Sequence, residues 1–282
     1  MARIVCVHGI AQELKSRESL LAEWAPSLCG GVSNAGGHIE ASDVDMAFYG
    51  ILFRALGSKS GDGSVIAIPS YRPGDLEDEL EVQLLEALFD AAGGTEVDTG
   101  TKSGIAPRSV NRMLQVVSAV PYFGKQAQNL VIWFLKQVRR YVTDPEIRKA
   151  AQDSLIALIA EDTRVIVAHS LGTIVAYETL SAGHGPGVHT LITLGSPLGT
   201  PALLSRFKPP TVPGKSSAPG SLASWVNIAD AADIVALKKS LRPIYGRRVT
   251  DHLVNNGSTM HHVLPYLTAR ETGGAIIDGL RS

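Results

Sequence analysis

The stretch Val165-Ile166-Val167-Ala168-His169-Ser170-Leu171-Gly172 indicates the fold of this chain more clearly than any other part of it. Its first half is apolar and largely β-branched, which is typical of a strand buried on both faces of a sheet. An apolar segment of helical length follows, so a single tight turn at Ser170 joins the two elements. Such a turn strains the backbone, lifts the hydroxyl above the sheet edge and places it at the positive end of the helix. Only small residues fit two positions before and after this serine, and Ala168 and Gly172 meet that condition.

The rest of the chain alternates short runs rich in Val and Ile with longer amphipathic stretches. We predict strands at residues 4–7, 44–48, 164–168, 190–194, 225–229 and 248–254. We predict helices at residues 20–29, 76–92, 111–120, 125–141, 145–161, 171–182 and 263–278. Asp144 followed by Pro145 is a good signal for the start of one of them. This alternation predicts an α/β protein with a doubly wound, mostly parallel sheet of about six strands.

Length and composition limit the organisation and the partners of the chain. Its 282 residues suit one domain over residues 1–282, with a helical cap inserted at about 100–145. The formal net charge of −1 provides no basic surface for a polyanion, so we expect no nucleic-acid partner. The 2 cysteines, Cys6 and Cys29, cannot make a disulfide framework and suit a reducing compartment. No apolar run reaches the roughly 7–15 residues of a signal peptide or the ~20 of a membrane span. We therefore expect a cytoplasmic location and no transmembrane segment.

Polar residues that suit acyl-transfer chemistry follow several of the predicted strands. A nucleophilic serine needs donors for the developing oxyanion, a base, and a group that orients the base. The first strand leads into His8-Gly9-Ile10-Ala11-Gln12, and the strand at 225–229 leads into Asp230 and Asp233. The loop after the last strand contains His261 and His262. Because the carboxyl ends of parallel strands meet at one edge of a sheet, we expect these groups to lie near the serine.

These segments together resemble the α/β-hydrolase superfamily, in particular its bacterial lipases and esterases. The turn at Ser170 reads Ala-x-Ser-x-Gly where the family commonly has Gly-x-Ser-x-Gly, and the order of serine, aspartate and histidine is that of the fold. The segment Thr193-Leu194-Gly195-Ser196-Pro197-Leu198-Gly199 is similar to the Gly-Ser-Pro turn of lipase-like members. The resemblance covers most of the chain, except for the insertion and the proline-rich loop at 207–222.

The resemblance implies roles for particular residues. Ser170 would be the nucleophile, and the backbone N–H groups of Ile10 and Leu171 would form the oxyanion hole. His8 is expected to brace its loop rather than to transfer protons.

Two aspartates are candidates for the acid, and two histidines are candidates for the base. Asp233, in Asp233-Ile234-Val235-Ala236, fits the family pattern for the acid better than Asp230, which would hold the turn instead. His261 aligns with the catalytic histidine through the Tyr-Leu pair that follows it, and His262 is the alternative, a residue that starts the next helix.

The implied activity is that of a serine hydrolase that forms an acyl-enzyme from a carboxylic ester, with no metal and no cofactor. The predicted cap contains many apolar residues and would favour an apolar acyl group, unless these side chains only pack the insertion onto the core. They are Val116, Val117, Val120, Tyr122, Phe123, Leu130, Val131, Trp133, Phe134 and Val138. Lys136, Arg139 and Arg140 would either meet anionic lipid headgroups or form a solvated helix face.

Other activities fit the same residues. A thioesterase, an amidase or peptidase, and an acyl-transferring cyclase all use this chemistry, and the fold does not choose among them. A catalytically silent binding protein with the same fold is the alternative from another class.

Overall fold

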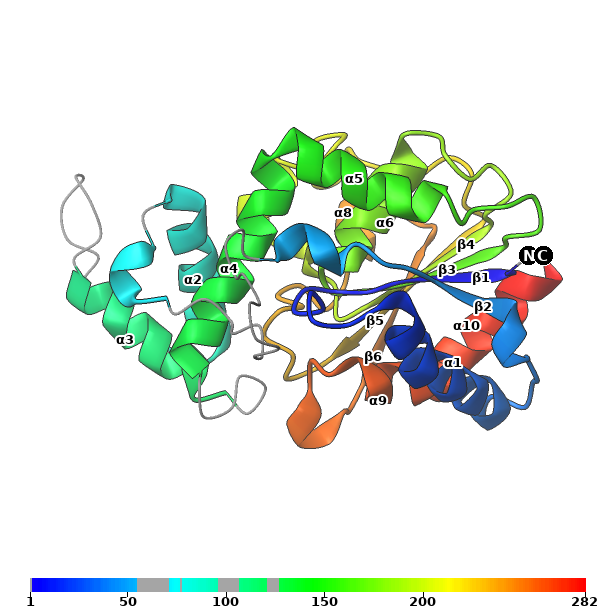
Figure 1. The fold of residues 1–282 in the computed structure, drawn as a ribbon, viewed down its shortest axis with the longest axis horizontal. Coiled ribbons are helices and arrows are strands. Elements are labelled where there is room, and N and C mark those ends of the chain that lie inside the picture. Colours follow the sequence, from blue (N-terminus) through cyan, green and yellow to red (C-terminus); the bar gives the residue numbers. More distant parts are fainter. Residues whose placement is uncertain (1, 55–70, 77, 96–106, 121–126) are drawn as a thin grey trace, which may run out of the picture.

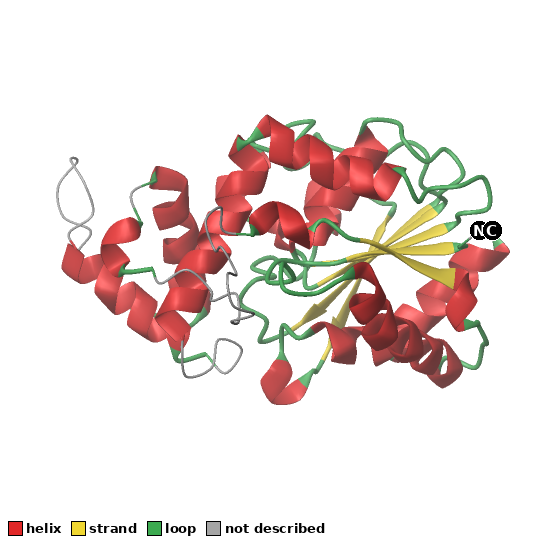
Figure 2. Ribbon diagram, viewed as in Figure 1, coloured by secondary structure: helices red, strands yellow, loops and turns green. Residues whose placement is uncertain are grey.

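The computed structural model describes residues 2–54, 71–76, 78–95, 107–120 and 127–282. Within them, one open sheet has the strand order β2-β1-β3-β4-β5-β6, and every neighbouring pair is parallel. The strands are β1 (Ile4–Val7), β2 (Val44–Ala47), β3 (Val165–His169), β4 (Thr190–Leu194), β5 (Ser224–Asp230) and β6 (Val249–Val254). The predicted doubly wound α/β class is confirmed, and the sheet is entirely parallel where a mostly parallel one was predicted (Figure 2).

Helices cover both faces of the sheet (Figure 1). One face packs against α1 (Arg17–Asn34), α9 (Val263–Thr268) and α10 (Arg270–Arg281), and the other against α5 (Pro145–Ile156), α6 (Leu171–Ser181) and α8 (Arg242–Tyr245). In β1, Ile4 and Cys6 belong to the first core, whereas Val5 and Val7 belong to the second. Because successive side chains of a strand point to opposite faces, strands covered on both sides are apolar throughout.

The helices α2 (Glu79–Ala91), α3 (Pro107–Ser118) and α4 (Ala127–Thr143) lie together at the end of the molecule opposite the chain termini (Figure 1). Several apolar side chains of the predicted cap are buried in the same core as one sheet face, among them Val117, Val131, Phe134 and Val138. Tyr122 and Phe123 lie outside the described residues. The burial supports packing of the insertion onto the core, and its role as a cap over the site stays a prediction.

The basic residues of α4 contact acidic residues at the start of α2. Lys136 lies 3.3 Å from Glu81, whose side chain is buried, and Arg139 lies 2.7 Å from Asp78. Arg140 donates to a backbone carbonyl oxygen. These charges therefore join α4 to its neighbours, which the sequence analysis did not foresee. Among the residues that the structure describes, none of the helices combines the length and apolar character that spanning a bilayer requires.

The predicted helix at 263–278 is in fact two helices. Ala269 has an extended backbone conformation, with φ −61° and ψ 140°, and separates α9 from α10. The Thr272 hydroxyl donates to the Tyr266 carbonyl oxygen at 2.6 Å, which satisfies an acceptor at the end of α9. The predicted start signal of α5 is confirmed, since the Asp144 side chain accepts hydrogen bonds from the first turn.

The helix α6 crosses β1 at Gly172. A Cβ atom at this position would lie 2.4 Å from each of the carbonyl oxygens of Val7 and His8. These acceptors belong to the backbone of a central strand and of the loop that follows it, so they cannot rotate away. A residue without a side chain is therefore required here, where the motif predicted a small one.

We expect Gly172→Ala to lower the free energy of unfolding by about 3 kcal/mol, because the added methyl group overlaps backbone atoms. Gly274→Ala is the matched control, since Gly274 lies inside α10 and a Cβ added to it would meet no atom within 4 Å. That change should raise the stability by up to about 1 kcal/mol through helix propensity alone. Urea unfolding of both variants measures the difference, and equal effects would contradict the close crossing.

Candidate active site

Ser170 occupies a strained turn between β3 and α6. Its backbone has φ 52° and ψ −126°, a positive φ that residues with a side chain seldom adopt. The Ser170 N–H donates to the Leu194 carbonyl oxygen of β4 at 3.1 Å, and the Thr173 hydroxyl donates to the Ser170 carbonyl oxygen at 2.7 Å. These contacts from β4 and from α6 hold the turn on both sides. The serine side chain is thereby fixed at the end of β3.

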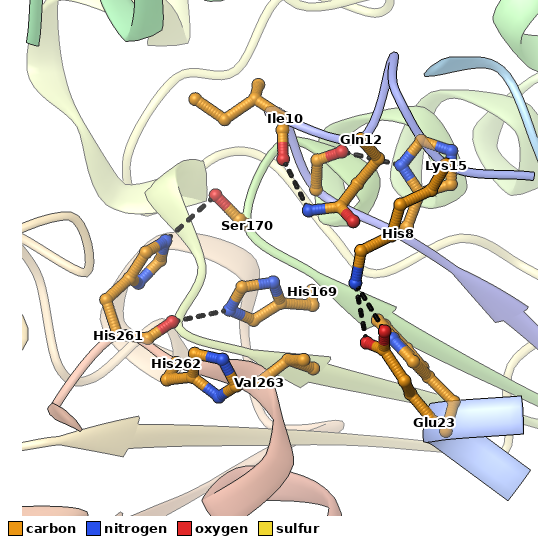
Figure 3. A pocket seen from close by; sticks show the side chains of 12 residues that line it. His8, Ile10, Gln12, Lys15, Glu23, His169, Ser170, His261, His262 and Val263 are labelled. Carbon is orange, nitrogen blue, oxygen red and sulfur yellow. Dashed lines mark hydrogen bonds and ion pairs between the residues drawn. The ribbon is translucent and has the colours of Figure 1, made fainter. Parts of the chain in front are cut away.

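A chain of hydrogen bonds joins Ser170 to His261 and Asp233. The Ser170 Oγ lies 3.0 Å from His261 Nε2, and His261 Nδ1 lies 2.7 Å from Asp233 Oδ2. Since the ionised carboxylate can only accept, Nδ1 carries a proton, and an Nε2 without a proton accepts the serine hydroxyl. The structure thus brings together the preferred serine, histidine and aspartate of the sequence analysis (Figure 3 shows the Ser170–His261 contact).

The carboxylate of Asp233 is buried but has several donors. Val235 N–H donates to Oδ1 at 2.9 Å, and the Tyr266 hydroxyl donates to Oδ2 at 2.8 Å. Burial alone would raise the pKa of Asp233, but the charge and hydrogen bond of His261, with the bonds from Tyr266 and Val235, outweigh it and lower the pKa to about 2. Asp233 is therefore ionised at neutral pH.

The two alternative residues have other contacts. Asp230 accepts a hydrogen bond from Ala232 N–H at 2.7 Å and another from Asn256 N–H, so it joins the loops after β5 and β6. His262 is exposed, and its Nδ1 lies 3.4 Å from the Leu264 N–H at the start of α9. Asp230 therefore holds the turn after β5, and His262 stands at the start of α9. These are the structural positions expected for the aspartate and the histidine that are not part of the triad.

The loop after β1 is held by His8. Its Nδ1 donates to the Gly9 carbonyl oxygen at 2.6 Å, and its Nε2 accepts the Tyr49 N–H at 3.1 Å. The His8 and Tyr49 rings are stacked, with centroids 4.1 Å apart. Burial lowers the pKa of His8 to about 4, so the ring is neutral at pH 7. These contacts agree with the bracing role expected for it.

The backbone amides of Ile10 and Leu171 lie on the two segments that flank Ser170. Leu171 is the first residue of α6, where a backbone N–H has no partner within the helix. Neither amide donates a hydrogen bond to any residue that the structure describes. Both therefore remain able to donate to a bound group, and their role as an oxyanion hole stays a prediction.

Gly195 and Tyr266 belong to the site, although the sequence motifs that contain them gave neither residue a role. Gly195 has φ +53°, and a Cβ on it would lie 2.8 Å from Asp233 Oδ2 and 3.0 Å from His261 Nδ1. A side chain there would separate the acid from the imidazole, which gives the Gly-Ser-Pro turn a physical reason. The Tyr266 hydroxyl donates to Asp233 and accepts the Asp230 N–H at 2.7 Å. Only its place in the Tyr-Leu pair could have indicated this residue.

Ser170 and His261 line a pocket that holds about 500 Å³ of empty space, its opening to solvent included (Figure 3). The pocket is lined by His8, Gly9, Ile10, Gln12, Lys15, Glu23, Trp24, His169, Ser170, His261, His262 and Val263. Lys15 Nζ and Glu23 form an ion pair at 2.6 Å on one wall. Most of the lining is polar, and none of it comes from the described residues of α3 or α4.

A separate hollow lies between α2, α4 and the loops after β4 and β5. It is lined by Leu84, Leu88, Phe134, Val138, Pro197, Thr200, Leu203, Val235 and Leu237, and it holds about 290 Å³ of empty space. Ser170 is not part of this apolar lining. In the described ranges, no three His, Cys, Asp or Glu side chains are grouped so as to hold a metal ion.

No protein-family model, curated protein or solved structure matches this chain. The α/β fold itself is shown by the parallel six-stranded sheet and the helices that flank it.

We expect the free energy of unfolding to fall as the pH drops from about 6.5 toward 4. The pKa of His8 is about 4 in the folded protein and about 6.5 when unfolded, so only the unfolded state takes up its proton in this window. The stabilisation from a neutral His8 is complete above pH 6.5, and about 3 kcal/mol of it is lost by pH 4. Urea unfolding at several pH values measures the change.

His8→Gln is the control, because other groups also titrate in this window. The pKa of His169 is lowered by burial and acts in the same direction, whereas the low pKa of Asp233 matters only below about pH 3.8. The variant should be less stable than the native chain at pH 7.5 and should lose less on acidification. Parallel curves for the two proteins would show that His8 does not titrate in this way.

Proposed function

We propose that this protein is a serine hydrolase of the α/β-hydrolase superfamily that cleaves carboxylic esters through an acyl-enzyme. The observation that carries the proposal is the unbroken set of hydrogen bonds from Asp233 through His261 to Ser170. The three residues are distant in the sequence and come from loops after three different strands of the parallel sheet. In an open parallel sheet, such loops at the carboxyl edge are the usual place for a site.

In the first step, Ser170 Oγ attacks the ester carbonyl carbon while His261 Nε2 takes up the hydroxyl proton. Asp233 holds the Nδ1–H tautomer and stabilises the imidazolium that forms. The carbonyl oxygen becomes an oxyanion, which the N–H groups of Ile10 and Leu171 stabilise, an effect worth about 3–4 kcal/mol per donor. His261 then passes the proton to the leaving alcohol as the carbon–oxygen bond breaks.

In the second step, water takes the place of the alcohol. His261 removes a proton from the water as it attacks the acyl carbon, and the same two amides stabilise the second oxyanion. Breaking the bond to Ser170 Oγ, with return of the proton to that oxygen, releases a carboxylic acid and restores the enzyme. Proton transfer by a histidine typically contributes about 10²–10⁴-fold to such a rate.

The alternative activities differ in the leaving group or in the acceptor. A thiol, an amine or an internal nucleophile would give a thioesterase, an amidase or peptidase, or an acyl-transferring cyclase with the same residues. We favour esters over amides because an ester carbonyl is less stabilised by resonance than an amide carbonyl and is attacked more readily. A catalytically silent binding protein would have no need for the strained conformation of Ser170 or for its contact with His261.

The size and polarity of the acyl group follow from the pocket beside Ser170. Its walls contain histidines, Gln12 and the Lys15–Glu23 ion pair, which suit a short or polar group. The apolar acyl group predicted from the insertion would instead have to reach the hollow between α2 and α4, which Ser170 does not line. We therefore propose a short acyl group as the preferred substrate.

We expect a fluorophosphonate probe to label the native protein on Ser170 and to leave Ser170→Ala unlabelled. The probe's phosphorus takes the place of the ester carbonyl carbon, so labelling requires an activated hydroxyl. Mass spectrometry of the labelled peptide identifies the modified residue. Asp233→Asn should slow labelling by about 10³–10⁴-fold, because the wrong imidazole tautomer is then favoured.

Two control variants test the assignment within this experiment. Ser196 is a suitable control because it also follows a strand of the sheet closely, after β4. Its hydroxyl contacts Thr173 and caps a turn, so Ser196→Ala should keep the label. His262→Gln should keep it as well, because its ring is exposed, whereas His261→Gln should lose it. Labelling of Ser170→Ala at the native rate would refute the proposed function.

We expect p-nitrophenyl acetate to be hydrolysed with at least about tenfold higher kcat/KM than p-nitrophenyl decanoate. The polar pocket cannot cover a long apolar chain, so its burial would give little binding energy. Val138→Phe narrows the apolar hollow and should affect neither ester. A preference for decanoate that this variant removes would support the apolar acyl group in place of the short one.

A further inference from the structure

His169 is a buried titratable residue that the proposed mechanism does not use. It is the last residue of β3, directly before Ser170, and only 7% of its surface is exposed. The aromatic rings of Trp24, His261 and Tyr266 surround it, with centroids 6.5, 4.8 and 6.1 Å away. These neighbours fix the plane of the imidazole, and the residue is part of the lining of the pocket beside Ser170.

The hydrogen bond on one side of the ring determines the chemistry of the other side. His169 Nε2 lies 3.0 Å from the backbone carbonyl oxygen of His261, which can only accept, so Nε2 carries a proton. Burial, and then the charge of His261, lower the pKa of His169 well below its usual value, so the ring does not take a second proton. Nδ1 is therefore an acceptor with a lone pair. No donor from the described residues contacts it.

This acceptor and the side chain of Ser170 both lie close to Gly9. A Cβ placed on Gly9 would be 2.8 Å from Ser170 Cβ and 3.2 Å from His169 Nδ1, so one small group spans the distance between them. Figure 3 shows the ring with Nε2 toward His261 and its other nitrogen on the side of His8 and Lys15. Because His169 lines the pocket, a hydroxyl or N–H group of a bound molecule can donate to this nitrogen.

We propose that His169 Nδ1 determines specificity by accepting a hydrogen bond from a hydroxyl group of the substrate, so that the site prefers small hydroxy esters. The inference rests on the proposed ester hydrolysis and specifies its substrate class. Sites with a buried polar group aimed at a substrate hydroxyl discriminate strongly against analogues without it, because the polar group is then left unpaired. The hydroxyl lies a few bonds from the scissile carbonyl, on the acyl side or on the alcohol side.

Matched esters distinguish the two sides. Ethyl glycolate is compared with ethyl fluoroacetate, and 2-hydroxyethyl acetate with 2-fluoroethyl acetate, because fluorine resembles a hydroxyl in size and electron withdrawal but donates no hydrogen bond. Each ratio of kcat/KM is divided by the ratio of the alkaline hydrolysis rates of the same esters. In the native protein, we expect one of the two corrected ratios to favour the hydroxyl ester by about tenfold or more.

His169→Gln is the decisive variant, because glutamine can place its amide N–H near the position of Nε2 but has no acceptor at Nδ1. It should bring the corrected ratio close to one, because kcat/KM falls further on the hydroxyl ester than on the fluoro ester. His169→Asn places an amide at the Nδ1 position and loses the donor to His261. It should keep part of the preference and lower kcat/KM on both esters.

Three results would overturn the inference. They are corrected ratios near one in the native protein, an unchanged preference in His169→Gln, and an equal loss on both esters in that variant, which would indicate a merely structural role. The first depends on the native protein alone and applies even if a variant does not fold. Absence of Ser170-dependent hydrolysis and labelling would instead refute the proposed function itself, and the inference with it.

Discussion

The hydrogen bond between the Asp233 carboxylate and the His261 imidazole is the interaction on which the rest of the site depends. An ionised carboxylate buried without donors would be very costly, so every group around Asp233 has to supply them. The amide of Val235 and the hydroxyl of Tyr266 do so together with His261. The loop after β5, the loop after β6 and α9 are therefore joined at a single side chain, and their relative positions cannot change independently.

Tyr266 connects this charge to the packing of the sheet. Its ring is fully buried in the core beneath α1 and α9, while its hydroxyl reaches Asp233 and the Asp230 amide. The break at Ala269, which separates α9 from α10, ends the short helix that carries Tyr266. The sequence predicted one continuous helix over this region, whereas the structure has an extended residue between two helices, three positions after Tyr266. The polar site and the apolar core are thus stabilised by the same residue.

The strain at Ser170 is balanced by contacts on both sides of the turn. The Leu194 carbonyl oxygen accepts from its amide, and the close approach of Gly172 to β1 holds the first turn of α6 against the strand. Strained backbone conformations persist where the surrounding structure fixes them, and they are concentrated at functional sites. The pocket beside this turn is lined by residues of α1 and of the loop after β1, and most of them are polar. The charged residues of α4 pair instead with acidic residues at the start of α2. The proposed short, polar substrate therefore follows from the residues of α1 and of the loop after β1.

The amino-acid sequence alone determined the class of the fold, the positions of its strands and the turn at Ser170. Burial on both faces leaves a continuous apolar run, and a close helix–strand crossing leaves a small residue at a fixed distance from the serine, so both are recorded locally. The order of strands and loops also indicated which residues would gather at the carboxyl edge, and the resemblance to the α/β-hydrolases favoured Asp233 and His261 within each pair. Only the tertiary structure could show which side chains make contact there, what Tyr266 and Gly195 do, and that His169 lines the pocket with Nε2 held by the His261 carbonyl oxygen. These features depend on the directions of side chains from segments that lie far apart in the chain. Tertiary packing fixes those directions, and a local sequence pattern contains no information about it.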